Sequence, residues 1–200
     1  MWRKLLLTGL LLTAIEACPA GISLTPVANE YVSEGIKYTK LTFKDGDRRI
    51  EYDPPALWSY RMSGDRLLLL PKNSVRAEAA IQAAPLSRPP AFDKPMIEAA
   101  KAQFMSSIPP GAQSLVIVSE TENAIPMRGL PNYEFTATYK DLGMEFMRRT
   151  LFVNAGDTQL TFKFSAPRGE FETLYPPFRV SILSWEWVEP APSSTSVANR

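Results

Sequence analysis

Hydrophobic and polar residues alternate with a period of two over much of this chain, which is the pattern of strands that bury one face. The clearest runs cover 133–139, 144–153 and 160–164, and short turn sequences separate them. Tyr133 and Phe135 begin an aromatic face that continues along the first two runs. The pattern predicts a three-stranded antiparallel meander whose aromatic face needs a covering layer.

Two further hairpins are predicted in the first half, where glycine-containing turns join short alternating runs. The predicted pairs are 41–43 with 48–52 across Asp45-Gly46, and 58–62 with 66–70 across Ser63-Gly64-Asp65. The segment 75–84 fits two structures. Its alanines favour a helix, while its short length and the proline that follows favour a strand.

Helical spacing appears after these strands. Asp93 is a suitable N-cap and Pro95 suits the first turn. Apolar residues then recur at three-to-four spacing from Met96 to Phe104, and the predicted helix ends before Pro109. Near the C-terminus, the segments 168–175 and 178–187 also read as helical, interrupted by a pair of prolines. These helices would supply the layer that covers the sheet.

The N-terminus, residues 1–17, has the form of an export signal: two basic residues precede an apolar stretch that is too short to span a bilayer. Cys18 follows directly, and the sequence resembles a bacterial lipobox, with Ile15 at minus three and Ala17 at minus one. Glu16 departs from the usual small residue. The interpretation that Cys18 is lipidated therefore competes with ordinary cleavage after Ala17 or Ala20, and with a cysteine that is simply discarded.

The rest of the chain divides into three predicted parts. Residues 18–35 are mixed and polar and are interpreted as a tether. Residues 36–188 show no repeat and no shift in composition, and are predicted to form a single domain. Residues 189–200 are rich in proline and serine and are predicted to be disordered.

Composition excludes several kinds of chemistry. The chain has no histidine and one cysteine, which removes Ser-His-Asp and Cys-His catalysis, histidine metal sites and an internal disulfide. Its 22 basic and 21 acidic residues nearly cancel, so no basic field indicates a nucleic-acid partner. Glu120 and Glu122 have the spacing of strand neighbours and are the main carboxylate candidates for a cation site or a hydrolase. The default interpretation is a solvated surface, and no cofactor, metal or catalytic residue is predicted.

Aromatic residues are the better candidates for binding, because they bury a large area at a small cost in conformational entropy. The candidate patch consists of Trp58, Tyr175, Trp185, Trp187 and Arg128. In a helix the last two tryptophans would lie about 200° apart, and in an extended segment they would share a face. Core packing is the competing interpretation for all of these rings. The sharper hypothesis leaves one of the last two tryptophans partly exposed at a partner site.

The order of elements, with hairpins, a central helix, a meander and a C-terminal helix, resembles the Mog1/PsbP-like α/β/α sandwich. The resemblance is carried by 125–129, by the meander up to Ser165-Ala166-Pro167, and by 171–172 and 178–185. It implies an α+β fold in which an antiparallel sheet is covered by helices. It also implies a non-enzymatic role, since family members resembling the photosystem II extrinsic protein are binding subunits and no family-wide catalytic residue exists.

These observations together predict an exported bacterial protein of the cell envelope, either lipid-anchored or periplasmic. Without catalytic residue types, it is expected to bind another envelope protein or a membrane-associated component through its domain surface. The alternative is a periplasmic carrier that holds a small apolar ligand or lipid between sheet and helix. A carboxylate-dependent hydrolase is the least favoured class.

Overall fold

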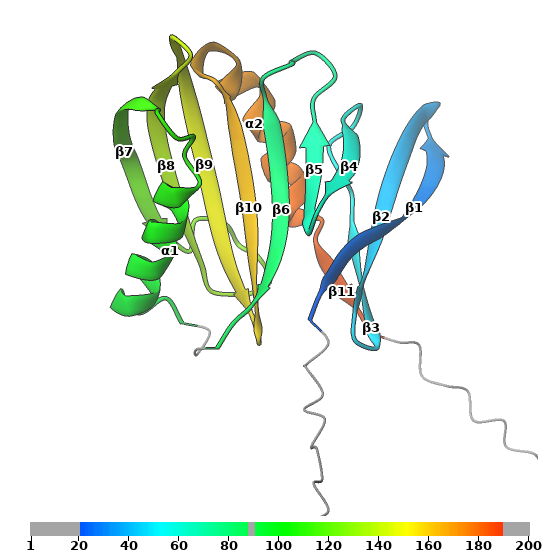
Figure 1. The fold of residues 1–200 in the computed structure, drawn as a ribbon. Helices are drawn as coiled ribbons and strands as arrows, with labels where there is room; N and C mark the ends of the chain where they lie inside the picture. Colours follow the sequence, from blue (N-terminus) through cyan, green and yellow to red (C-terminus); the bar gives the residue numbers. More distant parts are fainter. Residues whose placement is uncertain (1–20, 88–90, 190–200) are drawn as a thin grey trace, which may run out of the picture.

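The computed structural model describes residues 21–87 and 91–189, which form two antiparallel sheets and two helices (Figure 1). Within this part of the chain, the larger sheet has the strand order β4-β5-β6-β10-β9-β8-β7 and the smaller one β1-β2-β3-β11. The larger sheet contains β4 (Ser59–Ser63), β5 (Arg66–Leu70), β6 (Glu78–Pro85), β7 (Gln113–Glu122), β8 (Asn132–Asp141), β9 (Met144–Ala155) and β10 (Thr158–Pro167). The smaller sheet contains β1 (Ser23–Ser33), β2 (Ile36–Asp45), β3 (Arg48–Tyr52) and β11 (Glu186–Val188).

Both predicted hairpins and the predicted meander are present. β2 pairs with β3 and β4 with β5, and Gly46 and Gly64 in their turns adopt positive φ angles of 59° and 63°. β8, β9 and β10 pair in sequence order. The segment left open between helix and strand contains β6, which pairs with β10 and β5 and lies inside the larger sheet. Two of its alanines, Ala79 and Ala80, are almost fully buried in the sheet.

Helix α1 (Lys94–Ser106) packs on one face of the larger sheet, at the end formed by β7, β8 and β9 (Figure 1). As predicted, Asp93 caps it: a side-chain oxygen accepts the backbone N–H of Met96 at 2.9 Å. The buried ring of Phe104 stacks on Phe135 of β8, with 5.4 Å between ring centroids. The aromatic face of the meander is therefore covered by α1 over part of its width.

Helix α2 (Arg168–Leu183) covers the opposite face and buries Phe171, Tyr175 and Phe178 against Phe164 of β10. The expectation of two helical pieces broken by prolines is wrong, because α2 runs through Pro176 and Pro177 without interruption.

The two prolines are tolerated because they lie on the exposed side of α2, between two buried aromatic residues. Each proline removes one backbone donor, which leaves the carbonyl groups of Glu172 and Thr173 without their usual intrahelical partners. Glu172 and Thr173 are also exposed, so solvent can hydrate these carbonyl groups. Burial of the aromatic side chains on either side offsets the lost hydrogen bonds.

The expectation of a tether over 18–35 is also wrong for the described residues 21–35. Ser23–Ser33 forms β1, which pairs with β2 along nearly its whole length. Most of its side chains are exposed, and Leu24 is its one buried residue. Backbone pairing therefore holds this strand, and backbone pairing leaves no period-two signal in the sequence.

The predicted export signal, Cys18 and the predicted tail beyond residue 189 lie outside the described residues. Among the residues that are described, no helix is long and apolar enough to cross a membrane. The predicted class, an α+β fold with an antiparallel sheet covered by helices on both faces, is confirmed.

Candidate functional site

The face of the larger sheet that carries α1 is only partly covered by it, and the remainder is polar. On β10 the side chains of Thr161 and Lys163 point to this face, while Phe162 and Phe164 point to the α2 core. On β9, Thr150 points to the polar face. Polar side chains beneath a covering helix cost free energy unless they are hydrogen-bonded or hydrated. Their presence on this face therefore indicates a binding site rather than a packed core.

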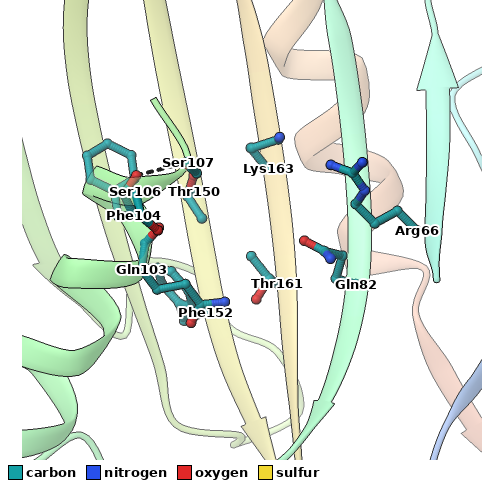
Figure 2. Close-up of a pocket in the computed structure, with 10 residues that line it drawn as sticks. All are labelled: Arg66, Gln82, Gln103, Phe104, Ser106, Ser107, Thr150, Phe152, Thr161 and Lys163. Atoms are coloured by element: carbon teal, nitrogen blue, oxygen red, sulfur yellow. Dashed lines mark hydrogen bonds between the residues drawn. The ribbon is translucent and has the colours of Figure 1, made fainter. Parts of the chain in front are cut away.

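A pocket of about 340 Å³ lies on this polar face, between the C-terminal end of α1 and strands β9, β10, β6 and β5 (Figure 2). Figure 2 shows Arg66 reaching across β6 toward Lys163, with Gln82 and Thr161 beside them and the end of α1 on the opposite side. The lining residues contain basic, amide and hydroxyl groups but no carboxylate: Arg66, Gln82, Gln103, Phe104, Ser106, Ser107, Thr150, Phe152, Thr161 and Lys163.

Positive charge dominates this pocket. The side chain of Lys163 is 14% exposed, and its Nζ lies 4.0 Å from Oε1 of Glu78, which is a long ion pair. Burial lowers the pKa of Lys163, the charge of Arg148 lowers it further, and Arg66 adds to the effect. Within the described residues, the side chain of Arg66 forms no ion pair or hydrogen bond. The folded protein thus holds several positive charges near one another, and nearby carboxylates neutralise them only in part.

Arg148 lies on the same face of β9, next to the pocket. Its Nη1 donates to the backbone oxygen and the hydroxyl group of Ser107, and its guanidinium lies 5.4 Å from the ring centroid of Tyr139. Burial lowers the pKa of Arg148 as well, although its guanidinium remains charged at neutral pH. Its Nε has no hydrogen-bond partner in the described structure.

Thr150 provides an independent sign of an unfilled site. Its side chain is 2% exposed, it lines the pocket, and its Oγ1 has no hydrogen-bond partner in the described structure. In the sheet register Thr150 lies directly opposite Lys163. A buried hydroxyl group left without a partner costs about 1–3 kcal/mol. A bound anion with an oxygen atom beside this hydroxyl group would accept its hydrogen bond and remove that cost.

The geometry favours binding of an anion over binding of a metal. Cationic donors line the pocket and acidic residues do not. In the described parts of the chain, no group of three or more His, Cys, Asp or Glu side chains is placed to hold a metal ion. Glu120, one of the two carboxylate candidates, forms an ion pair with Lys101 of α1, with Oε1 and Nζ 2.7 Å apart. This pairing accounts for Glu120 without a cation.

Two members of the predicted aromatic patch are buried, so neither offers a binding surface. Trp185 is 1% exposed and packs its ring against Phe43 and Phe162, both at centroid distances of 5.4 Å. Tyr175 is 6% exposed, and its hydroxyl group donates to Oε2 of Glu134 at 3.0 Å. For these two residues the core-packing interpretation applies. Trp185 is enclosed between the two sheets, and Tyr175 lies between α2 and the larger sheet.

Trp58 is half-buried and belongs to the same core. Its ring stacks on Phe178 of α2 at a centroid distance of 6.3 Å and packs against Phe164 at 6.0 Å. The patch as predicted is therefore not one continuous surface.

The structure does bring Arg128 and Trp187 together. They line a second pocket, of about 310 Å³, with Arg48, Leu130, Ala155, Gly156 and Asp157. The indole N–H of Trp187 donates to Oδ2 of Asp45 at 3.0 Å, and Nη2 of Arg128 lies 2.8 Å from Oε1 of Glu186. Arg128 has a positive φ angle of 49°, an uncommon conformation for a non-glycine residue. Trp187 is the partly exposed tryptophan of its pair.

Sequence reasoning missed the basic pocket, since Arg66, Lys163 and Thr150 are spread over three strands and form no motif. A signal was nevertheless present. Thr161 and Lys163 alternate with phenylalanines on a strand that lies inside the sheet, with helices on both faces of that sheet. Polar residues at positions of such a strand that face a covering helix indicate a polar pocket.

Comparisons with known proteins show a likeness of fold. No protein-family model matches the sequence, and no curated protein matches it. Among solved structures, the chain is similar to LpqN of Mycobacterium tuberculosis, described as involved in cell envelope biogenesis, with a TM-score of 0.53 and 12% identity over 82% of this chain and 92% of LpqN. It is also similar to the cyanobacterial PsbP of Synechocystis, with a TM-score of 0.48 and 11% identity over 89% and 99% of the two chains.

The resemblance to the Mog1/PsbP-like sandwich therefore holds at the level of fold. Identities near a tenth of the residues transfer no binding site, so function rests on the side chains described above.

Proposed function

We propose that this chain is an exported, non-catalytic protein of the cell envelope, and that its basic pocket binds an anionic group of another envelope component. The observation that carries the proposal is the incompletely compensated positive charge of Lys163 and Arg66 next to the unpartnered hydroxyl group of Thr150. Export is supported by the signal-like residues 1–17, and a binding role by the absence of histidine and of a cysteine nucleophile in the mature sequence.

The polar lining favours an anionic ligand over the apolar ligand of the carrier hypothesis. On the α2 side, the space between sheet and helix is filled by Phe164, Phe171 and Phe178. On the α1 side, eight of the ten residues that line the pocket carry charged or hydrogen-bonding side chains, and the other two are Phe104 and Phe152. An apolar ligand placed there would bury these groups without partners, at a cost of about 1–3 kcal/mol for each one.

The test is a titration of the purified protein with inorganic phosphate, followed by calorimetry and by thermal unfolding. We expect phosphate to raise the melting temperature of the wild type. Lys163→Met should weaken binding about tenfold or more, since a charge-assisted hydrogen bond contributes about 1.5–3 kcal/mol. Lys140→Met is the matched control, because Lys140 is an exposed lysine of β8 outside the pocket. Equal affinity in all three proteins would refute the proposal.

Stability without phosphate distinguishes a binding lysine from a structural one. Because burial and neighbouring cations lower the pKa of Lys163, the folded state disfavours its charge. Lys163→Met should therefore raise the free energy of unfolding at neutral pH while it weakens phosphate binding, which is the combination expected of a residue kept for binding rather than for stability. A lysine that only stabilised the fold would give the opposite change in stability.

The pocket at Arg128 and Trp187 is proposed as the contact surface for an envelope protein, because it brings two residues of the predicted patch together. Trp187→Ala should weaken that contact and leave the response to phosphate unchanged. Retention of partner binding by a folded Trp187→Ala protein would remove this surface from consideration.

Anchoring through Cys18 is part of the same proposal and has a separate test. The intact mass and N-terminus of the protein extracted from its native envelope should show a lipid-modified Cys18. A free N-terminus beyond this residue would indicate a periplasmic or secreted protein, without affecting the anion site.

A further inference from the structure

The basic pocket is larger than a bare anion requires. Its volume of about 340 Å³ lies at the lower end of the range for small-molecule pockets, which is about 300–1,000 Å³. A phosphate or carboxylate group beside Lys163 and Arg66 would occupy only one part of it. The rest of the pocket must match the part of the ligand to which the anionic group is attached.

The hydrogen-bonding groups differ between the two sides of the pocket. Lys163 and Arg66, on the sheet, can only donate. Gln103 and Ser106 lie on the last turn of α1, on the other side. Thr161 lies between the two sides, and Gln82 lies beside Arg66 (Figure 2). Amide and hydroxyl groups both donate and accept, which is the pattern that complements the hydroxyl groups of a ligand.

The neutral groups on α1 are also accessible. Gln103 is exposed, and its side-chain amide forms no hydrogen bond within the described structure. The hydroxyl group of Ser106 donates to the backbone oxygen of Gln103 at 2.9 Å and retains its acceptor capacity. A ligand hydroxyl group between them would gain a donor and an acceptor without breaking this bond.

From this arrangement we infer that the ligand is a phosphorylated polyol or sugar. Its phosphate group lies between Lys163, Arg66 and the hydroxyl group of Thr150, and its hydroxyl groups face Gln103 and Ser106. The inference rests on the proposed function, because it assigns the ligand class of the same pocket. The same chemistry is offered by a free polyol phosphate and by the headgroup of a phospholipid.

The experiment compares the affinities of glycerol 3-phosphate, inorganic phosphate and glycerol for the purified protein by calorimetry. We expect glycerol 3-phosphate to bind about tenfold more tightly than phosphate, since each neutral hydrogen bond contributes a factor of about three to ten. Glycerol alone should show no measurable binding. Lys163→Met should weaken the binding of both phosphates.

Gln103→Ala separates the two halves of the site. It should lower the affinity for glycerol 3-phosphate about threefold to tenfold and leave the affinity for inorganic phosphate unchanged. Gln113→Ala is the matched control, because Gln113 is an exposed glutamine of β7 outside the pocket lining. If Gln103→Ala lowered the affinity for both ligands equally, the placement of the ligand hydroxyl groups beside Gln103 would be wrong.

The outcomes also separate this inference from the proposed function. If phosphate binds and glycerol 3-phosphate binds no more tightly, the inference fails while the anion site stands. If neither binds, both fail. Displacement of bound glycerol 3-phosphate by phosphatidylglycerol vesicles, and not by phosphatidylcholine vesicles, would support the inference with a lipid headgroup as the source. The absence of displacement would support it with a free polyol phosphate.

Discussion

Trp185 connects the two sheets, and its substitution gives a sharp test of the packing described above. The residue lies between α2 and β11, and its ring contacts Phe43 and Tyr52 of the smaller sheet and Phe162 of the larger one. A buried tryptophan removes about 150–250 Å² from water, and its replacement by alanine typically costs about 3–5 kcal/mol. Since small domains unfold at about 5–15 kcal/mol in total, Trp185→Ala should leave the protein only marginally folded.

Trp185→Phe should behave differently, because the indole N–H has no hydrogen-bond partner in the described structure. Removing an unpartnered buried donor removes a desolvation cost of about 1–3 kcal/mol, which opposes the stability lost with the apolar area. We therefore expect Trp185→Phe to lie within about 1.5 kcal/mol of the wild type. Trp187→Ala, at a half-buried position, should cost less than Trp185→Ala.

Equilibrium unfolding in urea, with the slope compared between variants, measures these differences. A cost below about 1 kcal/mol for Trp185→Ala would refute the conclusion that this ring joins the two sheets. A cost for Trp185→Phe as large as for alanine would refute the argument from the unpartnered donor.

Three further predictions follow from single interactions. Asp93→Ala should destabilise the protein by about 1 kcal/mol and raise amide exchange in the first turn of α1, because the N–H of Met96 loses its cap. Asn132→Ala should cost about 2–3 kcal/mol in urea unfolding, since its buried side chain accepts from the backbone of Ile125 and donates to the carbonyl oxygens of Ile125 and Leu130, and these partners would be left unpaired. Burial, together with the nearby carboxylate of Glu134, raises the pKa of Tyr175 to about 12. Because an unfolded tyrosine loses its proton near pH 10 and the folded one keeps it, stability should fall as the pH rises above about 10, and Tyr175→Phe should reduce that fall in urea midpoints measured at about pH 8 and pH 10.5.

The parts of the fold that could be predicted are those in which local chemistry and tertiary packing agree. The turn at Asp45-Gly46 requires a positive φ angle, and the glycine there provides it. Asp93 and Pro95 begin α1 in the sequence for the same reasons as in the structure. The meander was predictable because each of its strands has a distinct buried face.

The errors occur where tertiary contacts override a local rule. Pro176 and Pro177 predict a break, but the rings of Tyr175 and Phe178 hold the helix on the sheet. β1 is held by its backbone hydrogen bonds to β2, which the side-chain pattern does not record.

The candidate site was harder to predict than the fold. Trp185 and Trp187 are equivalent in sequence, and only the closure of the smaller sheet decides which one is buried. Lys163, Arg66 and Thr150 meet only because β10, β5 and β9 occupy particular places in the strand order. Such a juxtaposition depends on topology, which no local pattern contains.

The pairing of β11 with β3 determines when the protein can finish folding. The smaller sheet takes three strands from the beginning of the described chain and one from its end, and Trp187 lies opposite Ile50 in the register. The hydroxyl group of Tyr52 reaches Ser181 at 2.8 Å, and the hydroxyl group of Ser184 accepts the N–H of Asp53 at 2.8 Å. The N-terminal strands must therefore wait for residues 181–188 before their core closes, which makes the closing of this core a non-local step of folding.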